Sequence, residues 1–141
     1  MQIKTKFFGT VECEPNMIFQ FPQGVPGFET EHRFLLIQPE NSVFSCLQSV
    51  ETETVAFITV SPFLVCPDYS FDLDEGTVAN LELNKLEEAL VLAIVTIPDQ
   101  NPRQTTLNLK APIIINRINQ RGYQVIVNEN YPLRAPLVKE A

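Results

Sequence analysis

The sequence predicts an all-β domain, mainly antiparallel, folded as a small β-barrel-like or sandwich domain with one or two short helices. Eight or more short segments rich in β-branched and aromatic residues alternate with polar or proline-containing stretches. Parallel strands need crossovers of about a dozen residues or more, and the chain leaves little room for them. Its 141 residues, 45% of them hydrophobic, suffice for a single domain, residues 1–141, with a real core.

The first half of the chain contains most of the predicted strands. Apolar residues alternate with lysines over 3–7, and Gly9 can turn the chain into a second strand at 11–13. Further strands are expected at 17–21, 34–37, 44–47 and 55–60. The stretch FPQGVPGF, residues 21–28, has two glycines and two prolines, so we expect an ordered loop there.

The second half is expected to mix strands with short helices. We expect a strand at 68–75, a helical turn within 74–83, a short helix begun by an Asn84–Glu87 capping box, a strand at 90–97, a strand-like stretch at 105–118 around Pro112, and a hairpin turn at 120–122 leading into 123–127. The end of the chain, about 129–141, contains two prolines and is expected to be extended or frayed.

Charge and composition exclude several classes of protein. The formal net charge is −7 and lysine and arginine form no patch, so direct binding to a nucleic-acid backbone is not expected. No apolar run approaches the roughly 18 residues that cross a bilayer, and the N-terminus lacks the features of a signal peptide. We therefore expect no membrane association.

The sequence contains no recognisable catalytic, metal or cofactor motif. Its single histidine, His32, has no second histidine or suitably spaced cysteine with which to bind zinc. The three cysteines Cys13, Cys46 and Cys66 are widely spaced, as expected for buried reduced thiols. No nucleophile elbow or phosphate-binding glycine loop is present. We expect no enzyme, no metal and no cofactor.

The stretch PFLVCPDYSFDL, residues 62–73, leads into an acidic row. If 68–75 is a strand, Tyr69, Phe71 and Leu73 point inward and the intervening Asp68, Asp72 and Asp74 point outward, with Glu75 beside them. The row has two interpretations: it solvates and blunts a strand edge, or it is half of an electrostatically matched interface for a basic partner.

Two further groups of residues also have two interpretations. Phe63, behind Pro62, is either core or an exposed interface anchor. In TTLNLKAPIIIN, residues 105–116, alternate apolar residues share one face, and Asn108, Lys110 and Asn116 share the other. The two asparagines either anchor loops or contact a partner. The candidate partner-binding residues are therefore Phe63, Asp68, Tyr69, Asp72, Asp74, Glu75, Asn108, Lys110 and Asn116.

Three stretches, taken together, resemble the flagellar assembly factor FliW family. They are FPQGVPGFE (21–29), PFLVCPDYSFDL (62–73) and TTLNLKAPIIIN (105–116), in this order and at this spacing. ALVLAIVTIP (89–98) and TKFFG near the start are also similar to that family. The resemblance runs from about the first strand to Asn116.

The resemblance implies a cytoplasmic, non-enzymatic β-domain with two protein partners. It implies binding of newly made flagellin before export. It also implies that the free protein binds the translational repressor CsrA and antagonises it allosterically, so that flagellin translation is coupled to export. The alternatives are a small-ligand-binding β-barrel, whose lumen would hold a metabolite, and an enzyme whose site is assembled from distant acids. A flat acidic surface with an apolar centre favours protein binding, and an enclosed pocket with convergent polar groups favours ligand binding.

Overall fold

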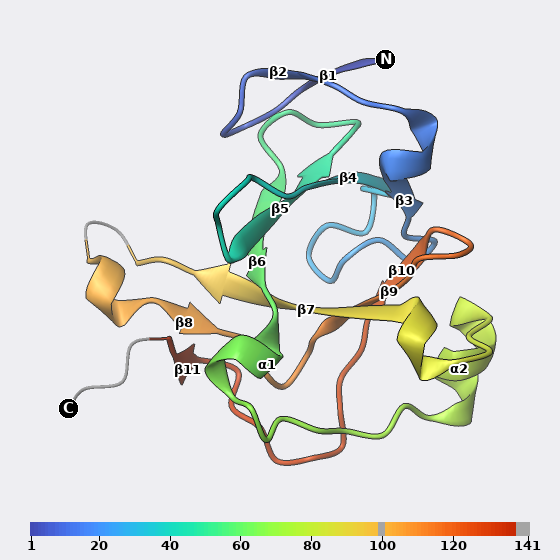
Figure 1. Ribbon diagram of the computed structural model, residues 1–141, viewed down its shortest axis with the longest axis vertical. Coiled ribbons are helices and arrows are strands. Elements are labelled where there is room, and N and C mark those ends of the chain that lie inside the picture. The colour runs from blue at the N-terminus through green and yellow to red at the C-terminus, as the bar shows by residue number, and fades with distance from the viewer. Residues whose placement is uncertain (99–100, 138–141) are drawn as a thin grey trace.

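A closed β-barrel forms the body of the protein (Figure 1). The structure is a computed structural model that describes residues 1–98 and 101–137. The strands are β1 (Gln2–Lys4), β2 (Thr10–Glu12), β3 (Ile18–Gln20), β4 (Arg33–Ile37), β5 (Phe44–Ser49), β6 (Ala56–Val60), β7 (Ala89–Thr96), β8 (Thr106–Leu107), β9 (Ile113–Asn116), β10 (Arg121–Gln124) and β11 (Ala135–Pro136). The helices are α1 (Pro62–Val65) and α2 (Glu75–Leu81), with short 3-10 turns η1 (Pro15–Met17), η2 (Leu86–Glu88) and η3 (Pro102–Gln104).

Seven strands close the barrel in the order β7, β6, β5, β4, β3, β10 and β9, with β9 pairing back to β7. All these pairs are antiparallel except β3 with β10, which meet at Gln20 and Arg121. The predicted fold class, a mainly antiparallel β-barrel with two short α-helices, is confirmed.

Strand β7 also carries a small arm outside the barrel. Its first half pairs with β9, and Val95 and Thr96 pair with β8, which in turn pairs with β11 (Figure 1). Between these two pairings, β7 has only two residues, 93–94, whereas the chain between β8 and β9 has five, 108–112. The expectation of a strand-like stretch through 105–118 is wrong at this point, because Asn108 and Pro112 break the strand. The Asn108 Oδ1 accepts hydrogen bonds from the next backbone N–H groups, which makes a turn.

Aromatic and aliphatic side chains fill the barrel interior. Phe21 and Phe34 are fully buried and meet edge to face, with ring centroids 5.1 Å apart. Val25, Leu47, Leu92, Ile113 and Ile115 complete this cluster. Gly122 on β10 lies directly against the Phe21 ring, so that an added Cβ would come within 2.5 Å of it. Glycine is therefore needed there to let the ring fill the core.

Two terminal elements pack against the barrel. Ile3 of the β1–β2 hairpin and Cys13, just after it, are buried against Ile18 and Leu35. At the other end, β11 extends the sheet beyond β8, within the range expected to be extended or frayed. The last four residues of that range, 138–141, lie outside the described residues.

Candidate functional site

The acidic row lies within residues 66–83, a segment that begins directly after α1 and includes α2. We call this segment the acidic strap. The expectation of a strand at 68–75 is wrong, because residues 66–74 pair with no other strand. The expected alternation nevertheless holds: Tyr69 is only 3% exposed, and the aspartates on either side of it point outward. The helical turn expected within 74–83 is α2.

Hydrogen bonds from side chains, rather than pairing with a neighbouring strand, hold the strap to the barrel. The Tyr69 hydroxyl donates to the Leu109 carbonyl oxygen at 2.6 Å. The Tyr131 hydroxyl accepts from the Ser70 N–H at 3.0 Å and donates to the Ser70 carbonyl at 3.1 Å. A tyrosine from the C-terminal part of the chain thus satisfies backbone groups that a neighbouring strand would otherwise satisfy.

Tyr69 is the centre of an aromatic cluster. Its ring centroid lies 5.7 Å from that of Phe63, 5.4 Å from that of Phe71 and 4.5 Å from that of Tyr131. Burial raises the pKa of the Tyr69 hydroxyl far above its usual value, with the neighbouring Tyr131 adding to the rise. The hydroxyl therefore stays protonated and serves as a donor that anchors the strap.

The aspartates of the strap have different roles. The carboxylates of Asp68 and Asp72 are exposed. The Asp74 Oδ1 accepts a hydrogen bond from the Thr77 N–H at 2.7 Å, which makes Asp74 the N-cap of α2. The same backbone bond lowers the pKa of Asp74. Asp74 thus shapes the strap, whereas Asp68 and Asp72 add only charge.

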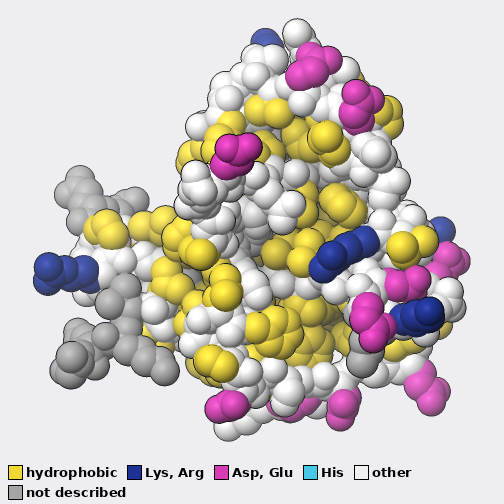
Figure 2. Space-filling model, in the orientation of Figure 1, with side chains coloured by type: hydrophobic (Ala, Val, Ile, Leu, Met, Phe, Trp, Pro, Cys, Tyr) yellow, Lys and Arg dark blue, Asp and Glu magenta, His cyan; other side chains and the backbone are white. Residues whose placement is uncertain are grey.

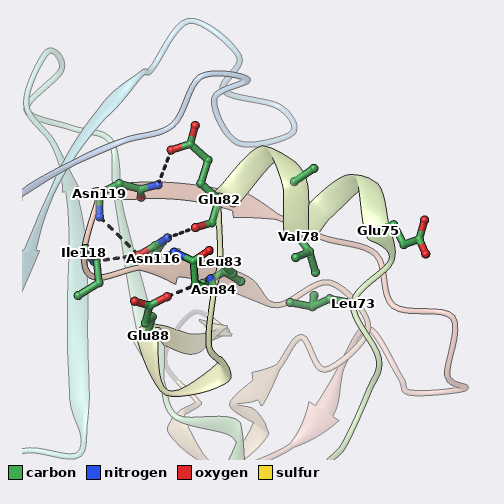
Figure 3. A pocket seen from close by; sticks show the side chains of 11 residues that line it. Leu73, Glu75, Val78, Glu82, Leu83, Asn84, Glu88, Asn116, Ile118 and Asn119 are labelled. Carbon is green, nitrogen blue, oxygen red and sulfur yellow. Dashed lines mark hydrogen bonds between the residues drawn. The ribbon is translucent and has the colours of Figure 1, made fainter.

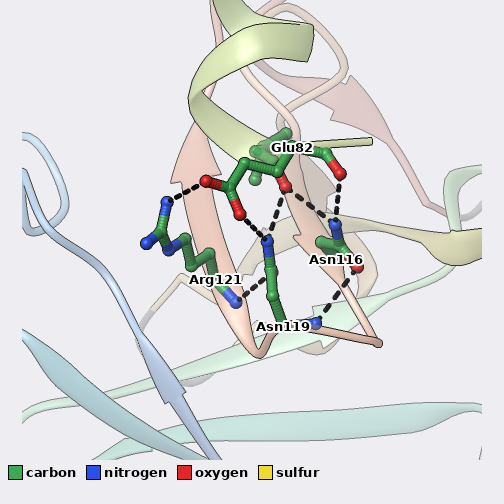
Figure 4. Close-up of polar contacts among 5 residues, drawn as sticks. Glu82, Asn116, Asn119 and Arg121 are labelled. Carbon is green, nitrogen blue, oxygen red and sulfur yellow. Dashed lines mark hydrogen bonds and ion pairs between the residues drawn. The ribbon is translucent and has the colours of Figure 1, made fainter. Parts of the chain in front are cut away.

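Two asparagines, Asn116 at the end of β9 and Asn119 in the turn that follows, hold the other end of α2 (Figure 4). Asn116, 1% exposed, donates from Nδ2 to the Leu81 carbonyl at 2.7 Å, and Asn119 donates to the same oxygen at 2.9 Å. The helix ends at Leu81, and the C-cap residue that follows, Glu82, has a left-handed φ of 54°. Side-chain amides therefore satisfy carbonyl groups that have no partner within the helix.

The remaining candidate residues fall into two groups. Asn108 and Lys110 bind backbone atoms: the Lys110 Nζ donates to the Glu129 carbonyl at 2.8 Å, and Asn108 forms the turn described above. Like Asn116, they hold loops in place. Phe63 on α1 is 44% exposed and its neighbour Leu64 is 64% exposed, so both present apolar surface. Glu75 is exposed at the start of α2.

An apolar face bordered by carboxylates results from this arrangement. In Figure 2, hydrophobic side chains gather between α1 and α2, and acidic side chains follow the lower edge of the molecule below them. Between residues 66 and 98 there are seven acidic residues and one basic residue, Lys85. Such a face suits a partner with apolar and basic groups.

Two hollows adjoin this face. One, of about 880 Å³, lies between the Val65–Asp68 stretch and the arm formed by η3, β8 and β11. The other, of about 580 Å³, lies between α2, η2 and the β9–β10 turn (Figure 3). Sequence reasoning missed the second hollow, because Val78, Leu83 and Ile118 meet there only in the fold.

The capping box predicted at Asn84 is made by a different residue. The Glu88 carboxylate, not that of Glu87, accepts the hydrogen bond from the Asn84 N–H.

The described residues offer little for catalysis or for ligand binding inside the barrel. Within them, no three His, Cys, Asp or Glu side chains gather closely enough to hold a metal ion. The His32 Nδ1 lies 3.2 Å from the Phe21 carbonyl oxygen, a backbone contact. The lumen is filled by Phe21, Phe34 and Leu47, which are fully buried. A barrel packed in this way leaves no room for a small molecule.

Comparisons with known proteins agree with this description. The family model described as FliW protein matches residues 2–137. A flagellar assembly factor FliW of Thermoanaerobacter pseudethanolicus is 39% identical, with 99% of this chain and 95% of the relative covered. One of Bacillus licheniformis is 41% identical, with 100% and 99% covered. A crystal structure of the flagellar assembly factor FliW superposes with a TM-score of 0.93 at 38% identity, over 99% of both chains.

The fold defines a small, mainly antiparallel β-barrel protein with an apolar face bordered by carboxylates. The chain belongs to the FliW family of flagellar assembly factors. This is not a known family of enzymes. The resemblance of the three sequence stretches is therefore confirmed. Among the described residues, no helix has the length and hydropathy that crossing a membrane requires.

Proposed function

We propose that this protein binds newly made flagellin in the cytoplasm and, when free of flagellin, binds the translational regulator CsrA and antagonises it allosterically. Flagellin translation would then follow flagellin export. In this role the protein is a chaperone and regulator, without catalytic activity. One observation carries the proposal beyond family membership: the apolar face between α1 and α2 is bordered by exposed carboxylates.

The chemistry of this face fits the two partners in different ways. Flagellin segments that are disordered before assembly are amphipathic, and an apolar surface with nearby grooves can capture them. Phe63 and Leu64 project from α1 and supply exposed apolar surface to such a segment. An RNA-binding regulator is basic, so the carboxylates of Asp68 and Asp72 favour its approach.

The alternative, a barrel that binds a small ligand, has less support. Its lumen would have to hold a metabolite, and large apolar side chains occupy that space. Both hollows described above lie on the outside of the barrel, between the barrel and its helices or arm. We therefore favour recognition of protein partners.

Titration calorimetry with monomeric flagellin tests the proposal. We expect saturable heat with the monomer and none with assembled filaments. Replacing Phe63 and Leu64 together by serine should weaken binding at least tenfold. A matched control is Met17→Ser on η1, which removes a comparably exposed side chain far from α1 (Figure 1) and should leave the affinity unchanged. Absence of heat at about 100 μM monomer, a weak-binding range, would overturn the proposal.

A further inference from the structure

The hollow beside α2 is lined on one side by apolar side chains (Figure 3). Five side chains form the apolar wall: Leu73, Val78, Ala79, Leu83 and Ile118. Ile118 is 72% exposed, although it is a large apolar residue next to the pocket. The wall can therefore bury part of a long aliphatic side chain, and the exposed Ile118 would be covered by it.

The pocket is held open by bonds already present in the protein. Asn116 and Asn119 fix the C-terminal end of α2 through the Leu81 carbonyl, and Asp74 caps its N-terminal end. Both ends of the short helix are therefore positioned independently of any ligand. A ligand entering the pocket need not first order its walls, so little binding free energy is lost to ordering.

Glu88 is the carboxylate available to a cation at this pocket. Glu82 already pairs with Arg121, at 3.4 Å from Nη1 to Oε1 (Figure 4). Glu75 points away from the other labelled side chains in Figure 3. The Glu88 Oε1 accepts from the N–H groups of Asn84 and Lys85. Within residues 1–98 and 101–137 it has no ion pair.

We propose that this pocket receives an arginine side chain of a basic protein partner. The methylene groups would lie along Val78 and Ile118, and the guanidinium would face Glu88. The choice of a cation rests on charge: the residues that line the pocket include three glutamates and no lysine or arginine, and Glu88 lies opposite an apolar wall. Arginine suits it because its planar group is weakly hydrated and keeps its charge when partly buried. The inference rests on the proposed function for the identity of the partner, but not for the chemistry of the pocket.

Amide NMR spectra of the full chain, titrated with N-acetyl-arginine amide, test the inference. We expect saturable shifts of the signals from α2 and the β9–β10 turn, with a dissociation constant in the millimolar range. N-acetyl-citrulline amide has nearly the same shape without the charge and should bind about fivefold more weakly, as for the loss of one partly exposed ion pair.

Matched variants assign the charge effect to one carboxylate. Glu88→Gln keeps an oxygen that accepts from Asn84 and Lys85, so the local turn survives, but it should reduce binding of the arginine probe to that of the citrulline probe. Glu87→Gln changes the neighbouring exposed carboxylate, which does not line the pocket, and should have no effect. Ile118→Ser should weaken binding of both probes, because it removes part of the apolar wall.

Three results would overturn the inference: no saturable shift with the arginine probe, equal binding of the two probes, or equal effects of Glu87→Gln and Glu88→Gln. Failure here is distinguishable from failure of the proposed function. If flagellin and CsrA bind but the arginine probe does not, only the pocket assignment falls. If the probe binds as expected and neither protein does, the proposed partners are wrong and the pocket remains.

Discussion

The barrel and the acidic strap are held together by different forces. Ladder hydrogen bonds join the seven barrel strands, and fully buried side chains such as Phe34 and Leu47 fill the space between them. The strap instead is held by hydrogen bonds that the side chains of Tyr69, Tyr131 and Asn116 make with backbone atoms. Most of its residues are partly or fully exposed. The seven barrel strands contain two charged residues, Arg33 and Arg121, whereas the strap carries five carboxylates and buries only Tyr69 and Leu81.

This difference separates stability from recognition. Elements with few buried apolar contacts open at lower free energy than the core does. We therefore expect barrel substitutions to change the free energy of global unfolding. Strap substitutions should chiefly change the charge and the position of the carboxylates that border the apolar face. The experiments below test whether the two regions respond separately.

The largest expected effect is in the barrel. Phe34→Ala should reduce the free energy of unfolding by about 3–5 kcal/mol, because it leaves a cavity beside Phe21. Phe71 on the strap is only half-buried, so Phe71→Ala should cost less, about 1–2 kcal/mol. Urea denaturation of both variants measures the two values. Equal losses would show that the strap is as much a part of the core as the barrel.

Alkaline pH should weaken the barrel through Cys46 on β5. Burial raises the pKa of this thiol from 9.0 to about 11, so the folded state holds its proton more tightly than the unfolded state does. The resulting stability is complete below pH 9 and is lost as pH rises toward 11, by at most about 3 kcal/mol. Denaturation at several pH values should show this fall, and Cys46→Ala should reduce its slope in that window. An unchanged slope would contradict the assignment.

Removal of one strap anchor should have a smaller effect. Tyr69→Phe keeps the aromatic cluster but leaves the Leu109 carbonyl without its 2.6 Å hydrogen bond. The expected loss is about 1–2 kcal/mol. Hydrogen exchange should show faster opening of residues near 69, with the protection of β5 and β6 lowered no more than the global loss requires. Faster exchange confined to the barrel would mean that the hydroxyl does not hold the strap.

The smallest expected effect concerns the cap of α2. Asp74→Ala removes the acceptor for the Thr77 N–H and should cost about 1 kcal/mol. Asp72→Ala, which removes an exposed carboxylate two residues earlier, is the matched control and should stay within about 0.5 kcal/mol of wild type. Thermal unfolding followed by circular dichroism measures both. If the two variants lose stability equally, Asp74 has no special role as a cap.

The fold could be predicted from the sequence wherever local patterns determine it. The β-branched run at 90–97 becomes β7, and the alternation of apolar and acidic residues in 68–74 matches their burial. The same alternation led to the wrong prediction of a strand, since a pattern of period two does not show whether a neighbouring strand exists. Here the neighbours are the side chains of Tyr131 and Glu129, roughly 60 residues away in the chain.

The candidate site could be predicted only in part, for the same reason. The acidic row is visible in the sequence, but the hollow beside α2 depends on Asn116 and Asn119 reaching the Leu81 carbonyl, more than 30 residues earlier. No local pattern records that contact. The four-residue helix α1 was also missed, because the apolar run after Pro62 is too short to show a helical period.

The central claim is that the exposed carboxylates of the strap recognise a basic partner while the barrel supplies the stability. Asp68 and Asp72 are the residues for the test, because Asp74 also caps α2 and its reversal would disturb the helix. Reversal of both to lysine should leave the unfolding free energy within about 0.5 kcal/mol of wild type.

Stopped-flow measurement of the association rate with CsrA at two salt concentrations tests this claim most directly. Exposed charges at the edge of an interface act mainly on the association rate and its salt dependence. The account predicts that the double reversal slows association and flattens its dependence on salt. An unchanged rate with an unchanged response to salt would contradict it, and the acidic row would then serve only to keep the strap solvated.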